Sequence, residues 1–277
     1  MKKIAILLII GTLTTTLTAQ NLPRTSPSSK INQVVGLTEF SIDYSRPSVK
    51  GRTIFGELVP YDKVWRLGAN ECTKMTTSTN VKIGESILKP ATYALFAIPS
   101  KSGEWTIAFN SNIEQWGSTE YDATKNIGTI KVKAFENSFT ETLTIGFNNL
   151  TNNSGVISIK WDKLMINIPF TVDTDKIASQ NITDAIEKGE NLADVYKNAA
   201  DYYKGAKNNS MALTFIEKSI GIEKNHKNIF LKAEILKEMG EKDKAIKLAK
   251  EAIELAKEAK SNGWVNYISG TIEEWRK

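Results

Sequence analysis

The sequence predicts two consecutive domains, an all-β antiparallel sandwich of the jelly-roll kind followed by an all-α domain of helical repeats. Between about residues 30 and 173, polar and apolar residues alternate with a period of two in short runs, which is typical of strands with one buried face. From residue 176 onwards, apolar residues recur every three or four positions, as they do in amphipathic helices. No proline follows Pro169, which agrees with a region of uninterrupted helices.

The first residues have the features of a secretory signal peptide. Two lysines open the chain, a mostly apolar stretch covers residues 4–17, and a small-residue cleavage pattern ends at Ala19. We therefore expect residues 1–19 to be removed between Ala19 and Gln20, and the protein to be periplasmic or secreted. The apolar stretch is too short to span a bilayer. No cysteine lies near the cleavage point, so we do not expect a lipid to be attached there.

The predicted β domain covers residues 20–175. In the run from Thr38 to Tyr44, Phe40, Ile42 and Tyr44 lie on one face and their polar neighbours on the other. Similar runs, separated by turn-forming clusters such as residues 83–86 and 152–155, cover residues 64–67, 74–79, 93–98, 105–109, 128–135, 141–147, 156–161 and 164–172. Roughly nine to eleven short strands without intervening helices predict an antiparallel sandwich, because a parallel sheet needs crossover helices.

The predicted helical domain covers residues 176–277. A comparison of this region with itself at a constant offset aligns Tyr196 with Ile229, Ala200 with Ala233, and Ala212 with Ala245. The offset is close to the roughly 34-residue period of tetratricopeptide repeats, and the pattern resembles that repeat, with Gly240 at the turn between two helices. Helices around residues 182–188 and 264–275 would cover the open ends of two repeats. The alternative is a helical bundle with an accidental period.

The composition excludes several kinds of site. One histidine, His226, and one cysteine, Cys72, cannot supply the three or four ligands of a zinc, copper or iron–sulfur site, and no disulfide can form within the chain. Catalysis by a Ser/His/Asp or Cys/His arrangement is not indicated either, because His226 lies in the helical region. No glycine-rich nucleotide-binding loop occurs. We expect no metal and no cofactor.

The charge is nearly balanced in both halves. The whole chain has 36 basic and 31 acidic residues, a net charge of +5, and removal of Lys2 and Lys3 leaves 34 basic residues. Residues 20–175 have 16 basic and 15 acidic side chains, and residues 176–277 have 18 and 16. Neither half has the basic excess that phosphate backbones require, so nucleic acid is not an expected partner. No transmembrane segment is expected after signal removal.

Three of the five arginines lie close together in the sequence, at Arg46, Arg52 and Arg66. The forked guanidinium group suits carboxylates and phosphates, so arginines beside Trp65, Asn70 and Glu71 predict a pocket for a polar or acidic ligand. The alternative is structural, with Arg66 or Arg52 paired to Glu71 or Glu57, because buried charges are normally paired.

A second group follows at Gln115 and Trp116, where the ring would stack on a ligand and the amide would orient it. The alternative, which we favour for the ring, is that Trp116 plugs the end of the sandwich core. The predicted ligand-binding residues are Arg46, Arg52, Trp65, Arg66, Asn70, Glu71, Gln115 and Trp116.

Several of these motifs resemble those of a known exported bacterial family. The matching runs are residues 44–52, 54–56, 58–61, 64–66, 68–71 and 115–117. The chain resembles domain of unknown function 2911 over about residues 26–172. The resemblance implies a tetratricopeptide-like extension at residues 176–277 and no particular activity. The family pattern matches Arg46, Arg52, Arg66, Asn70, Glu71, Gln115 and Trp116, but Cys72 stands where the family pattern has alanine, which argues against an essential thiol.

We therefore predict a binding or assembly module of the cell envelope, with a ligand pocket in the β domain and a protein partner at the helical domain. The alternative is a hydrolase or lyase acting on an envelope carbohydrate or peptide, with Glu71 as acid or base. Glu71 is the one candidate catalytic residue, and the sequence leaves open whether the protein is an enzyme. A third possibility is that the helical domain alone binds a partner's peptide.

Overall fold

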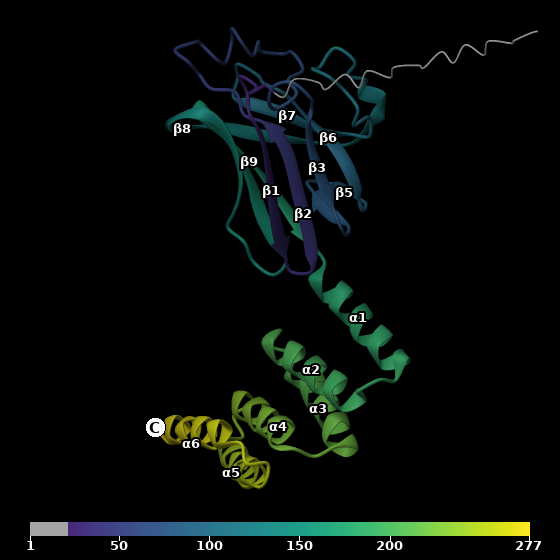
Figure 1. The fold of residues 1–277 in the computed structure, drawn as a ribbon, viewed down its shortest axis with the longest axis vertical. Helices are drawn as coiled ribbons and strands as arrows, with labels where there is room; N and C mark the ends of the chain where they lie inside the picture. Colours follow the sequence, from purple (N-terminus) through teal and green to yellow (C-terminus); the bar gives the residue numbers. More distant parts are fainter. Residues whose placement is uncertain (1–21) are drawn as a thin grey trace, which may run out of the picture. The chain divides into compact units, whose positions relative to one another are not determined.

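A computed structural model of the chain describes residues 22–277, so the expected signal peptide and its cleavage point lie outside the described residues. The chain divides into two compact units that meet between Val172 and Asp173. Strands make up the first unit and helices the second (Figure 1). The predicted order of an antiparallel β domain followed by an α-helical domain is confirmed.

Residues 22–172 form one nine-stranded antiparallel sheet with the order β1-β2-β3-β6-β7-β8-β9-β4-β5. A single 3₁₀ turn, η1 (Ala123–Lys125), precedes β8. The strands are β1 (Ser28–Val35), β2 (Thr38–Ser45), β3 (Thr73–Thr77), β4 (Val81–Ile83), β5 (Ser86–Leu88), β6 (Ala91–Ile98), β7 (Glu104–Asn110), β8 (Asn126–Asn148) and β9 (Ser154–Val172).

The expected strand at residues 64–67 is wrong. Trp65 forms only an isolated bridge with Ala97, and the chain around it turns through the left-handed region at Asp62, Leu67 and Asn70. Such positive φ angles are incompatible with an extended strand. The run is therefore a loop that is anchored to β6 at one point.

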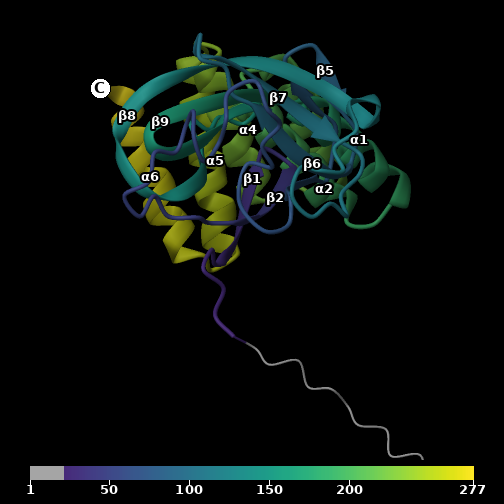
Figure 2. The same cartoon turned by 90° about the horizontal axis from the view of Figure 1, so that it is seen from above.

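Four of the predicted short strands are joined into two long ones. Residues 128–135 and 141–147 belong to β8, and residues 156–161 and 164–172 belong to β9. The β8–β9 register shifts around Thr140, and Asp162 has a φ of 53°. β-Bulges of this kind bend a strand without ending it. In Figure 2, β9 follows β8 around the bend.

The bend folds β9 back on itself. The Val172 N–H donates to the Asn153 carbonyl at 2.9 Å, and the Ser158 hydroxyl donates to Asn167 Oδ1 at 2.6 Å. The two halves of this one strand therefore lie beside each other.

The second half of β8 also contacts the segment that follows β2. The Val49 N–H donates to the Glu141 carbonyl at 2.8 Å, and the Leu143 N–H donates to the Pro47 carbonyl at 2.9 Å. The Tyr44 hydroxyl accepts a hydrogen bond from the Ile145 N–H at 3.1 Å. The sheet thus curls until segments from its two sides are hydrogen-bonded, and its inner face encloses the core.

Aromatic side chains fill much of that core. Trp65 stacks on Trp161 with ring centroids 5.7 Å apart, and Phe55 and Trp105 pack against them. Buried rings of this size supply a large share of the apolar area that stabilises a small β domain. The alternation of polar and apolar residues that predicted the strands reflects this core, because the apolar residues of each strand face inward.

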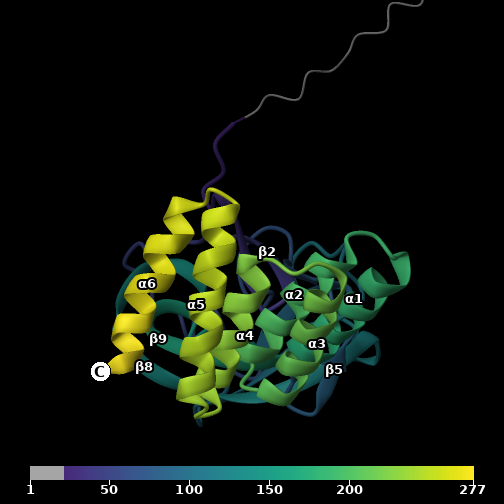
Figure 3. The same cartoon turned by 90° about the horizontal axis from the view of Figure 1, so that it is seen from below.

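The second unit consists of α1 (Thr174–Lys188), α2 (Leu192–Gly205), α3 (Asn209–Ile222), α4 (His226–Glu238), α5 (Lys242–Glu258) and α6 (Asn262–Arg276). The flanking helices that were expected around residues 182–188 and 264–275 are parts of α1 and α6. In Figure 3 the helices lie one after another along the unit.

The first residues of the helices recur at a nearly constant spacing along the chain. Helix α2 begins at Leu192 and α4 at His226, and the starts of α3 at Asn209 and α5 at Lys242 are separated by almost the same interval. Gly240, with a φ of 87°, lies at the turn between α4 and α5, where a left-handed residue favours glycine.

Ala212 and Ala245, which the repeat comparison aligns, are both closely packed. Ala245 is fully buried, as expected of a residue at which two helices approach each other. Among the helices of residues 22–277, none is both long and apolar enough to cross a membrane.

Candidate functional site

Two loops that are distant in the sequence meet at the site. The loop before β3 and the loop after β7 are joined by backbone hydrogen bonds from the Cys72 N–H to the Gln115 carbonyl and from the Gly117 N–H to the Asn70 carbonyl, both 3.1 Å. Glu71 and Trp116 face each other in an isolated antiparallel bridge. We call residues 65–73 together with residues 115–117 the loop junction. It brings part of the first predicted group, from Trp65 to Glu71, next to Gln115 and Trp116.

Arg46 and Arg52 have backbone acceptors elsewhere. Arg46 Nε donates to the Leu143 carbonyl, and its Nη2 donates to the Thr144 hydroxyl, both at 2.9 Å. Arg52 Nε donates to the Val49 carbonyl at 3.0 Å, and its Nη2 donates to the Ser48 carbonyl. Arg52 therefore stabilises the segment after β2 internally, and Arg46 connects that segment to β8. The guanidinium groups of the three predicted arginines therefore lie against different neighbours.

Arg66 differs from the other two because its side chain has no hydrogen-bond or ion-pair partner within residues 22–277. Its Nε is buried and unpaired. A Cβ placed on Gly117 would lie 3.9 Å from Arg66 Nη1, so the guanidinium lies against the loop that presents Trp116. Burial lowers the pKa of Arg66 from its usual value. A buried donor without an acceptor is energetically unfavourable, so Nε is the unsatisfied polar atom of Arg66.

Glu71 is paired, but not with the arginine that was expected. Arg24 Nη1 lies 2.9 Å from both carboxylate oxygens of Glu71, so the predicted pairing with Arg66 or Arg52 is wrong. A hydrogen bond from its own backbone N–H, together with the nearby Arg24, lowers the pKa of Glu71. The carboxyl group is therefore ionised at neutral pH.

Arg24 belongs to a segment that lies across the junction. Asn70 Nδ2 donates to the Ser26 carbonyl and to the Ser45 hydroxyl, both at 3.2 Å, and the Arg46 N–H donates to the Pro27 carbonyl at 2.8 Å. Sequence reasoning missed Arg24 because it stands alone in a short polar stretch with no periodicity and no motif.

An open groove of about 510 Å³ lies beside Glu71. Its charged side chains are paired, with Lys30 Nζ 3.2 Å from Asp43 and Lys74 Nζ 3.3 Å from Glu114. The groove is lined by Arg24, Ser28, Ser29, Lys30, Asp43, Tyr44, Ser45, Glu71, Cys72 and Lys74, and by none of the three predicted arginines.

Gln115 and Trp116 point in different directions. Gln115 is buried, and its Nε2 donates to the Asn112 carbonyl at 2.6 Å while its Oε1 has no partner. The Trp116 side chain is 62% exposed, so the expectation that it plugs the core is wrong. The bridge to Glu71 holds the backbone of Trp116 at the edge of the loop junction and leaves its ring in solvent.

Trp65 lies in the core and presents almost no surface to a ligand. Its Nε1 donates to the Gly68 carbonyl at 3.2 Å, and its ring packs among the other core aromatics. Gly68 itself is tightly confined, since a Cβ there would lie 2.9 Å from the Ser45 carbonyl oxygen. The role of Trp65 is therefore to fix the loop that carries Arg66.

Cys72 is also enclosed. Burial raises the pKa of the Cys72 thiol, whose Sγ lies 3.5 Å from the Ile113 carbonyl oxygen. A buried, protonated thiol is a poor nucleophile. Among residues 22–277, no group of three or more His, Cys, Asp or Glu side chains could hold a metal ion.

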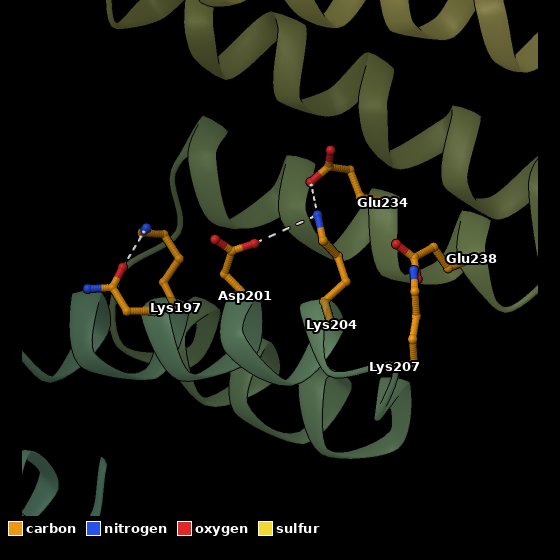
Figure 4. A network of polar contacts seen from close by, with 7 residues as sticks. Lys197, Asp201, Lys204, Lys207, Glu234 and Glu238 are labelled. Atoms are coloured by element: carbon orange, nitrogen blue, oxygen red, sulfur yellow. Dashed lines mark hydrogen bonds and ion pairs between the residues drawn. The ribbon is translucent and has the colours of Figure 1, made fainter. Parts of the chain in front are cut away.

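The helical unit has its own polar cluster, between α2 and α4 (Figure 4). Lys204 Nζ lies 2.8 Å from Glu234 and 3.7 Å from Asp201, and Lys207 pairs with Glu238 at 3.1 Å. Burial alone would lower the pKa of Lys204, but the hydrogen bond and the charge of Glu234 outweigh it, so the pKa is raised. The cluster links equivalent helices of the two predicted repeats.

The comparison with known families agrees with the motifs. A family described as a protein of unknown function, DUF2911, matches residues 26–170, which is just over half of the chain. The chain belongs to the DUF2911 family. The match includes the loop junction, β8 and all but the last two residues of β9, and it ends before the helical unit. No curated protein and no solved structure matches this DUF2911 member.

Proposed function

We propose that this DUF2911 member is an exported binding module whose loop junction holds a polar or acidic ligand. Cleavage after Ala19 would release it to the periplasm or beyond. The helical unit would then bind a protein partner, as tetratricopeptide repeats do.

The unpaired guanidinium of Arg66 carries the proposal for the β domain. Arg46 and Arg52 have protein acceptors, whereas Arg66 Nε is buried without one and lies beside the loop of the exposed Trp116. Buried polar groups in folded proteins are normally satisfied, so an orphaned donor at a surface loop favours an external acceptor. A carboxylate or phosphate fits the fork of Arg66, and an exposed indole suits an apolar or sugar face.

The helical unit supports an interaction role through its periodicity. The starts of α2 and α4, and likewise those of α3 and α5, recur at nearly the period of tetratricopeptide repeats, so two such repeats would be flanked by α1 and α6. Grooves between such helices commonly hold an extended or helical peptide.

Acid–base catalysis by Glu71 has less support. A general acid that works near neutral pH needs a raised pKa, whereas the pKa of Glu71 is lowered and Arg24 occupies both of its oxygens. Binding therefore explains the junction better than an enzymatic role.

A thermal-shift screen tests the proposal. The protein would be heated with peptidoglycan fragments, envelope glycans, acidic metabolites and short acidic peptides, since a ligand specific for the native state raises the melting temperature. At a ligand concentration of about 100 times Kd, the stabilisation is about 2.7 kcal/mol. We expect the shift to persist in Arg276→Met and to disappear in Arg66→Met. A shift of equal size in a folded Arg66→Met protein would contradict the proposal, as would the absence of any shift.

A further inference from the structure

The β domain has a second groove, on the outer face of the bent β8–β9 hairpin. Its volume is about 560 Å³, within the range of ligand-binding clefts. It lies where β9 doubles back, beside the hydrogen bond between Ser158 and Asn167. It shares no lining residue with the loop junction.

The charged side chains of this groove are all of one sign. Lys131, Lys133 and Lys160 line it, and no Asp or Glu does. Lys131 pairs with Glu104 at 3.0 Å, but within residues 22–277 Lys133 and Lys160 have no ion pair. The groove beside Glu71, by contrast, has acidic partners for its lysines. Lys133 lies opposite Glu104 in the β7–β8 register, but the Glu104 carboxylate pairs with Lys131. Two lysines without an ion pair therefore remain on one concave surface, and they favour an anion.

The remaining surface is largely apolar. Phe135 is 48% exposed, and it faces Met165 directly in the β8–β9 register. Val156 and Ile130 are half-buried, and Pro169 is exposed. Exposed apolar side chains that share a cavity mark a surface that gains stability when an apolar group covers it.

These two features lie on one surface. Lys133 is two residues before Phe135 on β8, so both side chains project from the same face of the strand. The amide of Asn167, which accepts from Ser158 through Oδ1, keeps its Nδ2 as a further donor. A ligand would therefore meet cationic donors and apolar side chains next to each other on this surface.

We propose that this groove binds a single-chain amphiphile with an anionic head group, namely a fatty acid. The carboxylate would lie between Lys133 and Lys160, and the hydrocarbon chain would cover Phe135 and Met165. The charge complementarity selects an anion over a cation. The apolar strip selects a hydrocarbon chain over a free phosphate or a nucleotide.

Titration calorimetry of the full chain with dodecanoate, below its micelle concentration, tests this assignment. We expect binding that tightens about fourfold for each methylene added between octanoate and dodecanoate, as burial of one more CH₂ predicts. Butyrate and inorganic phosphate should not bind measurably, and dodecyltrimethylammonium should bind at least tenfold more weakly.

The double variant Lys133→Gln/Lys160→Gln should weaken dodecanoate binding at least tenfold, and Phe135→Ser should weaken it severalfold. Lys101→Gln, on an exposed loop outside the groove, should leave it unchanged. Unchanged melting temperatures would show that the variants fold. Arg66→Met should also bind dodecanoate normally, which separates this groove from the loop junction. Equal binding of the cationic amphiphile, equal weakening by Lys101→Gln, or no binding of dodecanoate would overturn the proposal.

Discussion

Arg46 and Arg66 are chemically identical side chains that should respond to the same substitution in opposite ways. Methionine keeps much of the length and the apolar stem of arginine but removes the charge and the donors. In Arg46→Met the protein loses two hydrogen bonds of 2.9 Å, to the Leu143 carbonyl and to the Thr144 hydroxyl. In Arg66→Met it loses no protein hydrogen bond and no longer buries an unpaired Nε.

The expected magnitudes follow from these contacts. A hydrogen bond that involves a charged group contributes about 1.5–3 kcal/mol when buried. Arg46 is only partly buried, so we expect Arg46→Met to lower the free energy of unfolding by about 2–4 kcal/mol. Replacement of an unsatisfied polar group by an apolar one is neutral or stabilising, so Arg66→Met should change it by about 0 to +1 kcal/mol.

Urea unfolding provides the measurement. Tryptophan fluorescence should be compared with circular dichroism at 222 nm, because a chain of two units need not unfold in one step. A loss of more than about 2 kcal/mol in Arg66→Met would show that its guanidinium has a structural partner. That result would remove the argument for an external anion at the loop junction.

Three further predictions concern other parts of the chain. The lowered pKa of Glu71 stabilises the folded state above the unfolded carboxyl pKa of about 4.3, and this contribution is lost as the pH falls through the folded value. Glu71→Gln should therefore lower the free energy of unfolding by at most about 1 kcal/mol at pH 7, because the ion pair is exposed. In strong acid the substitution should have no effect, and urea unfolding at the two pH values would show the difference. Gly155→Ala should destabilise the β domain by about 1–3 kcal/mol, because the new Cβ would lie 2.5 Å from Phe170 Cζ. The control Gly146→Ala, where the new Cβ meets open space, should leave the melting temperature almost unchanged. Asn228→Ala should lower the stability of the helical unit by about 2–3 kcal/mol in circular dichroism melts, because the buried amide donates to two acceptors and its Oδ1 accepts from the N–H of Asn225, the N-cap residue of α4. A loss below about 0.5 kcal/mol would contradict that role.

The fold was largely predictable because each unit has one clear hydrophobic period. Alternation located β2, β3, β6 and β7 to within one or two residues, and the three-to-four-residue spacing located the helical region. What the alternation could not show is that β8 and β9 continue through their bends. Bulged residues such as Thr140 and Asp162 interrupt the period as a turn does, so a bent strand and two short strands look alike in sequence.

The site was less predictable because proximity in the sequence says little about side-chain direction. Arg46, Arg52 and Arg66 are close along the chain, yet Arg46 contacts Leu143, almost a hundred residues away. The partner of Glu71 lies 47 residues earlier, at Arg24, which no local pattern marks. The joining of the two predicted groups, through Glu71 and Trp116, depends on strand pairing that only the folded sheet provides.

The closure of the curled sheet has a consequence for the order of folding. The contacts that close it join residues 97 and 101 positions apart, as between Arg46 and Leu143 and between Tyr44 and Ile145. Contacts of such high sequence separation carry a large loop-closure entropy and form slowly. During synthesis from the N-terminus, β1 and β2 are made before β8, so the curled sheet can close only after β8 has been made. The helical unit, whose contacts are local, can fold as soon as its own residues have been made.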